Sequence, residues 1–195
     1  MLGCAHTPLA GDVPSTMGPS VAKLIKVVNG EEDGTCSVFK VGMDLAMTAG
    51  HCCEKGTDGE MVSYHAVEGA AIPGAGFEIR HDDDKHDVCI LRGMMKGAPL
   101  RLAHHDPVQG ERVWTAGYPK GVFLISEGLW SGRDSDGDGL ASVAVWGGAS
   151  GSPVMNRDGK VIGILRAYYP PMSNMAIIAP IEWVRATYLL GHAAK

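Results

Sequence analysis

The chain has 195 residues, of which 45% are hydrophobic and 20% charged, a balance typical of a folded protein and unlike that of disordered or fibrous chains. Its formal net charge of -5 gives no electrostatic support to nucleic-acid binding. No apolar run approaches the roughly 20 residues that a membrane-spanning helix needs, so we expect one large or two small globular domains.

Residues 1–20 form the first predicted segment, a flexible leader that contains Pro, Gly and polar residues. The stretch LGCA around Cys4, followed by this polar tail, resembles the end of a bacterial lipoprotein signal, which makes Cys4 a candidate lipid anchor. A leader with an incidental cysteine is the alternative. A secreted or periplasmic (cell-envelope) location is favoured, and a cytoplasmic location stays open.

Short apolar segments, each bounded by Gly, Pro, Asp or Asn, follow in two series. The first includes CSVFKVG, LAMTAG and DVCILRG, and the second includes ERVWTAGYP, LASVAVWGG and KVIGILRAYY. Regular short strands with turn signals predict an all-β sandwich or barrel. Two series predict two barrels, over residues 21–105 and 106–195. Only the stretch PIEWVRATYLLG has a helical pattern, with Pro180 at its start and Gly191 as its stop.

Three polar residues stand at the ends of these apolar segments: His51 in MTAGHCC, Asp87 in KHDVCILRG and Ser150 in GGASGSPV. A serine hydroxyl is a weak nucleophile near neutral pH. It needs a base within hydrogen-bonding reach, and that base needs a carboxylate to fix its tautomer. Each residue alone is commonly structural, but together, in the order His, Asp, Ser, they predict a catalytic triad.

The blocks TAGHC, DVCIL and GASGSPV resemble the signature blocks of the chymotrypsin-like (trypsin-fold) serine peptidases, over about residues 21–190. The short spacings are most similar to the compact bacterial and viral members. The resemblance implies two six-stranded antiparallel β-barrels and a short C-terminal α-helix, with the site in the cleft between the barrels. It also implies that His51 is the general base and then the general acid, Asp87 its orienting carboxylate and Ser150 the acylated nucleophile.

The same resemblance gives a role to the glycines that precede the nucleophile. The main-chain N–H groups of Gly148 and Ser150 would form the oxyanion hole, in which each donor contributes roughly 3–4 kcal/mol. The family pattern fails at Ala149, where animal trypsins carry an aspartate that pairs with a new N-terminus on activation. We therefore do not expect activation by N-terminal insertion.

The sequence has five cysteines and no CxxC pair, which argues against a zinc ribbon. The resemblance implies a disulfide between Cys36 and Cys52 that pins the histidine loop. Cys53 and Cys89 either form a second bridge or remain buried free thiols. No cofactor is expected for hydrolysis by a triad of this kind. No metal is expected either, because the acidic segment DSDGDG matches only the first half of a calcium loop.

Substrate preference depends on the residues around the nucleophile. An ungapped alignment with the family places Ala144 at the floor of the S1 pocket, and Leu165, Ala167 and Tyr168 along its wall. This apolar lining predicts a neutral, small-to-medium apolar residue before the cleaved bond. The alternative is that Arg166 reaches the pocket and favours acidic residues.

The predicted function is therefore that of a serine endopeptidase, which hydrolyses protein or peptide substrates through an acyl-enzyme. The principal alternative is a non-catalytic binding protein on the same double-barrel fold, although such a protein need not keep all three chemical groups. An esterase of the common α/β-hydrolase type is disfavoured, because its chain order is Ser, Asp, His.

Overall fold

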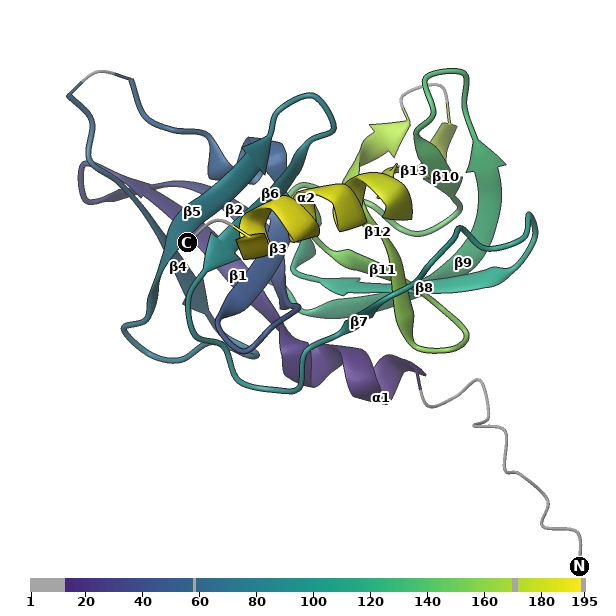
Figure 1. The fold of residues 1–195 in the computed structure, drawn as a ribbon, viewed down its shortest axis with the longest axis horizontal. Helices are drawn as coiled ribbons and strands as arrows, with labels where there is room; N and C mark the ends of the chain where they lie inside the picture. Colours follow the sequence, from purple (N-terminus) through teal and green to yellow (C-terminus); the bar gives the residue numbers. More distant parts are fainter. Residues whose placement is uncertain (1–12, 58, 170–171, 194–195) are drawn as a thin grey trace, which may run out of the picture.

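The computed structural model describes residues 13–57, 59–169 and 172–193. These residues form two β-barrels side by side, and one helix runs across both of them (Figure 1). The elements of the first half are α1 (Val13–Met17), η1 (Gly18–Ser20), β1 (Val21–Val28), β2 (Glu31–Lys40), β3 (Leu45–Ala49), η2 (Gly50–Cys53), β4 (Val62–Val67), β5 (Gly76–Asp83) and β6 (Val88–Arg92). Those of the second half are β7 (Arg101–Leu102), β8 (Arg112–Gly117), η3 (Pro119–Gly121), β9 (Leu124–Arg133), β10 (Gly139–Ala141), β11 (Pro153–Asn156), β12 (Lys160–Tyr169), β13 (Met172–Pro180) and α2 (Ile181–Ala193).

The first barrel is closed in the order β1-β2-β3-β6-β5-β4, with antiparallel pairings throughout. Its central strands are short and almost entirely apolar. All five residues of β3 are buried, as are the first four of β6. Strands buried on both faces lose the apolar–polar alternation of a half-exposed sheet, which is why these segments read as continuous apolar runs. They fix the positions of the residues at their ends.

The second barrel contains β11, β8, β9, β10, β13 and β12, and the pairing of β11 with β12 closes it. The predicted pair of six-stranded antiparallel barrels with a C-terminal helix is thereby confirmed. Strand β7 adds to this sheet in parallel to β12, through Arg101 opposite Lys160. A segment that precedes the expected boundary at residue 105 therefore pairs with the second barrel.

The N-terminal segment differs from the leader expected over residues 1–20. Residues 13–20 form α1 and η1, and Val13, Met17 and Ser20 are buried. The apolar side chains of Val13 and Met17 join the core and hold this segment in place. Residues 1–12, with the candidate lipid anchor Cys4, lie outside the described residues.

Helix α2 begins after Pro180 as expected but continues past Gly191 to Ala193. A Cβ at Gly191 would lie 2.2 Å from the side chain of Ile90 in β6, so glycine here permits close packing rather than ending the helix. No helix among the described residues is both long and apolar enough to cross a bilayer.

Candidate active site

His51 lies at the exit of β3, where the chain turns into η2. The preceding residue, Gly50, has no room for a side chain, since a Cβ there would lie 3.0 Å from atoms of Asp87. The absence of a Cβ lets the main chain of His51 approach Asp87, and the His51 N–H donates to Asp87 Oδ1 at 2.7 Å. The sequence GH after a buried strand thus brings the imidazole to the carboxylate.

Asp87 lies in the turn before β6, with a left-handed backbone (φ 54°) that a non-glycine residue rarely adopts. Its two carboxylate oxygens are each 3.0 Å from His51 Nδ1. Burial alone would raise the pKa of this carboxyl, but hydrogen bonds from His51 and Arg166 outweigh burial and hold the pKa below its ordinary value. Asp87 is therefore an anion that can orient the ring and stabilise its charged form.

The imidazole of His51 is poised to accept a proton. Its hydrogen bond to Asp87 raises its pKa above the ordinary value of 6.5, and the carboxylates of Asp87 and Glu54 act in the same direction. Burial and the charge of Arg166 oppose this rise. Because Nδ1 faces Asp87, the other ring nitrogen is left for a substrate-side partner.

Ser150 stands in the loop between β10 and β11, which residues of both barrels hold in place. The N–H of Ser37, in the first barrel, donates to the Ser150 carbonyl at 2.7 Å, and the Ser37 hydroxyl donates to the Gly148 carbonyl at 2.9 Å. Gly148 (φ 92°) and Gly151 (φ 85°) are both in the left-handed region. A Cβ at Gly151 would overlap Ser37 and Thr48 of the first barrel at 2.1 Å. Glycine is required here by conformation and by close approach.

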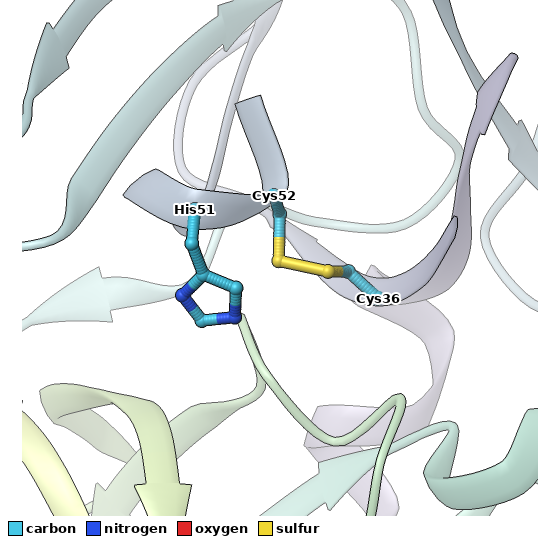
Figure 2. A group of neighbouring side chains, drawn as sticks. All are labelled: Cys36, His51 and Cys52. Carbon is cyan, nitrogen blue, oxygen red and sulfur yellow. A yellow bond between two sulfur atoms is a disulfide. The ribbon is translucent and has the colours of Figure 1, made fainter. Parts of the chain in front are cut away.

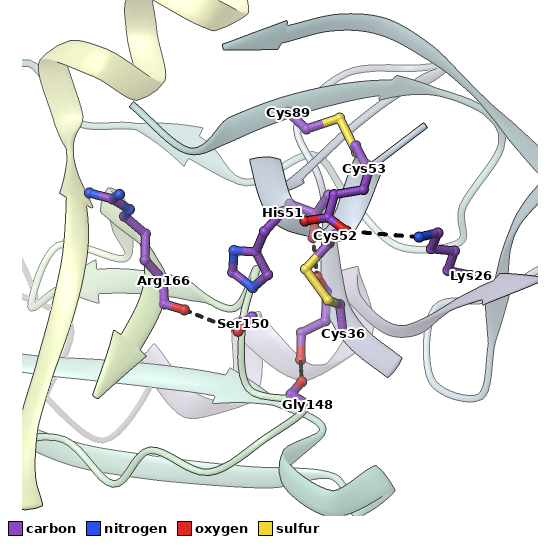
Figure 3. The surroundings of a disulfide bond; sticks show 12 residues. Lys26, Cys36, His51, Cys52, Cys53, Cys89, Gly148, Ser150 and Arg166 are labelled. Carbon is purple, nitrogen blue, oxygen red and sulfur yellow. Dashed lines mark hydrogen bonds and ion pairs between the residues drawn. A yellow bond between two sulfur atoms is a disulfide. The ribbon is translucent and has the colours of Figure 1, made fainter. Parts of the chain in front are cut away.

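The Ser150 hydroxyl donates to the main-chain carbonyl of Arg166 at 3.0 Å (Figure 3). No hydrogen bond joins it to His51 within the described part of the chain. His51 and Ser150 nevertheless line one cavity of about 220 Å³, together with Cys36 and Cys52. Catalytic hydrogen bonds are often unformed in free enzymes and tighten when substrate binds. The structure thus brings His51 and Ser150 to one cleft, and Asp87 is hydrogen-bonded to His51. Of the two hydrogen bonds that a triad of these residues needs, the one between Asp87 and His51 is formed.

The main-chain N–H groups of Gly148 and Ser150 donate to no protein atom in the ranges that the structure describes. The neighbouring amides are occupied, since Ala149 N–H donates to Trp146 and Gly151 N–H donates to Leu165. The two residues predicted for the oxyanion hole are thus left with free donors. An anionic oxygen is a fitting acceptor for such a pair.

Arg166 contacts Asp87, a position that the sequence did not indicate, since the sequence offers Arg166 only as an alternative part of the substrate pocket. Its guanidinium donates through Nε to Asp87 Oδ2 at 3.0 Å and pairs with Asp138 through Nη1. The side chain is thus held by two carboxylates. Arg166 lies within an apolar strand segment, where a buried charge needs a partner of opposite charge. This was the feature of the sequence that could have indicated its ion pairs.

Two disulfides surround the histidine: Cys36–Cys52, with an S–S distance of 1.99 Å, and Cys53–Cys89. Figure 2 shows the imidazole of His51 beside the first of these bonds. Cys36, His51 and Cys52 form the one group in the described residues whose spacing would suit a metal ion. Because both sulfurs are bonded to each other, they are not thiolate ligands.

The residues predicted for the substrate pocket do not together line either of the two cavities beside the nucleophile loop. Ala144 lines a cavity of about 170 Å³ with Trp146, Ala149 and Ser152. That cavity shares no lining residue with the cleft of Ser150. The other three predicted residues are absent from both linings: Leu165 is fully buried, and Ala167 and Tyr168 are exposed.

A family model described as a trypsin-like peptidase domain matches residues 34–164, which is more than half of the chain. The chain therefore belongs to the trypsin-like peptidase domain family and is a serine-type peptidase. This confirms the resemblance that the three sequence blocks indicated. The comparison with curated proteins gives no match.

Solved structures share the fold. A serine endoprotease from Yersinia pestis is 14% identical with a TM-score of 0.78, and the match covers 96% of this chain and 68% of that one. The active form of the Rv3671c protease from M. tuberculosis is 21% identical with a TM-score of 0.75, covering 94% and 85%. At these identities the likeness concerns the fold.

Proposed function

We propose that this peptidase cleaves bonds within proteins through an acyl-enzyme on Ser150, with His51 as the base and Asp87 as its orienting carboxylate. The observation that carries the proposal is the imidazole of His51, which Asp87 holds by Nδ1 at 3.0 Å inside the cleft that Ser150 also lines. This arrangement provides a nucleophile, a base and an anion in the chain order typical of the fold.

Acylation would begin with rotation of the Ser150 hydroxyl from the Arg166 carbonyl toward His51. Nε2 of His51 accepts the hydroxyl proton while Oγ attacks the substrate carbonyl carbon. The carbonyl electron pair moves to its oxygen, where the free N–H groups of Gly148 and Ser150 would stabilise the charge. The imidazolium then gives its proton to the leaving amine, and the C–N bond breaks. A water molecule repeats the sequence on the resulting ester and releases the acid.

We propose a preference for a neutral, small-to-medium apolar residue before the cleaved bond. Two features support this proposal. The guanidinium of Arg166 is engaged by Asp87 and Asp138, so it is not free to select acidic residues. Trp146, close to Ser150 in the chain, and Tyr168 of β12 expose 60% and 58% of their surfaces and offer apolar contacts. A cleavage profile on a peptide library tests it, and enrichment of Lys, Arg, Asp or Glu at this position would contradict it.

Labelling with a fluorophosphonate probe tests the triad. The wild-type chain should label on Ser150, and Ser150→Ala and His51→Ala should abolish labelling. Ser152→Ala is the matched control, because this nearby serine is 1% exposed and its hydroxyl has no hydrogen-bond partner among the described residues. It should label as the wild type does. A binding protein on the same fold would label in none of these forms, and that result would refute the proposal.

A further inference from the structure

Arg166 contacts residues at both ends of the proposed triad. Its side-chain Nε donates to Asp87 Oδ2 at 3.0 Å, and its main-chain carbonyl accepts from the Ser150 hydroxyl at 3.0 Å (Figure 3). The two contacts come from one residue of β12. A displacement of that residue would therefore reach the acid and the nucleophile together.

A β-bulge in β12 accompanies this placement of Arg166. Opposite β13, Leu165 is paired with Ile178 and Ala167 with Ile177, which leaves Arg166 as the extra residue of the bulge. A bulge breaks the strict alternation of side chains and redirects the residue that it contains. The buried Leu165 lies directly before it.

The guanidinium lies between two acidic groups in a partly shielded place. The side chain of Arg166 is 22% exposed, and those of Asp87 and Asp138 are 15% and 17% exposed. Arginine presents a planar set of donors that can hold two carboxylates at once, which the single ammonium of lysine does less well. Asp138 is itself held, because its N–H donates to Asp134 Oδ1 at 3.0 Å.

We propose that Arg166 is a positioning residue for the reaction: its guanidinium fixes the Asp87 carboxylate, and its main-chain carbonyl holds the resting Ser150 hydroxyl. This inference rests on the proposed function, since it assigns Arg166 a role through the other three residues.

Ionised groups from several elements face the His51–Asp87 pair. These groups come from three other parts of the fold: Glu54 after η2, Asp82 in β5 and Arg166 in β12, with Asp138 behind Arg166. The carboxylates of Asp87 and Glu54 favour the imidazolium, whereas the charge of Arg166 disfavours it. Loss of the Arg166 charge should raise the pH at which His51 loses its proton. Loss of the Asp138 charge should lower that pH, because the Arg166 cation is then less neutralised.

The decisive experiment compares Arg166→Gln with Asp138→Asn in full-length protein. The rate of fluorophosphonate labelling is measured from pH 5 to 9, and the titration of the His51 imidazole is followed by NMR, which needs no activity. The labelling rate rises with pH as His51 loses its proton, and we call this rising part of the pH–rate profile the acid limb. We expect Arg166→Gln to move the midpoint of the acid limb to higher pH by about half a pH unit or more. We expect its plateau rate to fall about tenfold or more, as the geometry loosens. Asp138→Asn should move the midpoint of the acid limb to lower pH.

Two further variants separate charge from packing. Arg166→Lys keeps the charge but not the planar donors. The midpoint of its acid limb should therefore stay within about 0.3 pH units of wild type, while its plateau labelling rate falls. Arg92→Gln removes an exposed arginine that pairs with Asp44 in the first barrel. This variant should change neither the midpoint of the acid limb nor the plateau labelling rate. Thermal unfolding of each variant confirms that it is folded.

The outcomes are distinct from failure of the proposed function. A wild-type chain that does not label refutes the triad itself. If the wild type labels, and Arg166→Gln and Asp138→Asn shift His51 in the same direction or not at all, Arg166 has no positioning role. Should Arg166→Gln not fold, a failure of Asp138→Asn to lower the His51 titration overturns the inference.

Discussion

The disulfide between Cys53 and Cys89 joins the segment that carries His51 to the strand that follows Asp87. Both sulfurs are buried, and each cysteine lies two residues from the histidine or the aspartate. The bond therefore restrains the imidazole and the carboxylate relative to each other. It acts on the same pair that the hydrogen bonds of Asp87 hold.

Removal of this bond by Cys53→Ala with Cys89→Ala should lower the free energy of unfolding by about 3–4 kcal/mol, because it closes a loop with a sequence separation of 36. Urea unfolding measures the change. The matched control is Cys36→Ala with Cys52→Ala, whose separation of 16 predicts a slightly smaller loss, about 3 kcal/mol. Equal stability of the first double variant and the wild type would contradict this account.

Adjacent glycines before the nucleophile should respond differently to alanine. Gly148 has φ 92°, and a Cβ there would lie 2.6 Å from the Tyr118 carbonyl oxygen. A Cβ at Gly147 would have no atom of another described residue within 4 Å, apart from its chain neighbours. Gly148→Ala must turn the Gly148 N–H, so we expect labelling to slow about 100-fold or more. Gly147→Ala should label within about threefold of wild type. Similar rates for both variants would remove Gly148 from the oxyanion hole.

The pH dependence of activity should follow His51. Since Asp87 raises the pKa of His51 above 6.5, the labelling rate should rise through a midpoint above 6.5. Asp87→Asn removes the carboxylate that raises the pKa of His51. The midpoint of the pH–rate profile of this variant should therefore fall, and its labelling rate should drop. His104→Gln, at an exposed histidine between the barrels, should leave the profile unchanged. A rate that is flat from pH 5 to 8 would exclude His51 as the base.

The stability of the same pair has a defined pH window. A histidine with a raised pKa in the folded state contributes stability that is fully present below its unfolded pKa of about 6.5. That contribution is lost as the pH rises through the folded value. The stability difference between wild type and His51→Gln should therefore be larger at pH 6 than at pH 9 in urea unfolding.

Asp82 should destabilise the fold at neutral pH. Burial raises its pKa to about 6, and Asp84 and Asp87 add to the rise. The folded state then binds more protons than the unfolded state between pH 4 and 6, so stability falls as the pH rises through this range. After allowance for solvent screening, Asp82→Asn should raise the free energy of unfolding at pH 7 by about 1 kcal/mol. Asp158→Asn, in an exposed turn, is the control. A loss of stability in Asp82→Asn would contradict the assignment.

The fold and the three candidate catalytic residues could be predicted because they depend on local patterns. TAGHC and GASGSPV combine a buried strand end with a glycine turn, and both features are visible in the sequence. The contacts of Arg166 could not be predicted, since they depend on a one-residue shift in the pairing of β12 with β13. The helical segment at residues 13–20 was missed for a similar reason, because Val13 and Met17 join the core only in the folded protein.

Ser37 makes the nucleophile turn dependent on both halves of the chain. This residue of β2 donates its N–H to Ser150 and its hydroxyl to Gly148, and that hydroxyl also accepts the N–H of Tyr118 at 2.8 Å. A C-terminal half produced alone would lack these hydrogen-bond partners, and nothing from the first barrel would fix the conformation of its nucleophile turn. Competence for catalysis should therefore emerge only upon assembly, so complementation of the two separately expressed halves would restore labelling that neither half has alone.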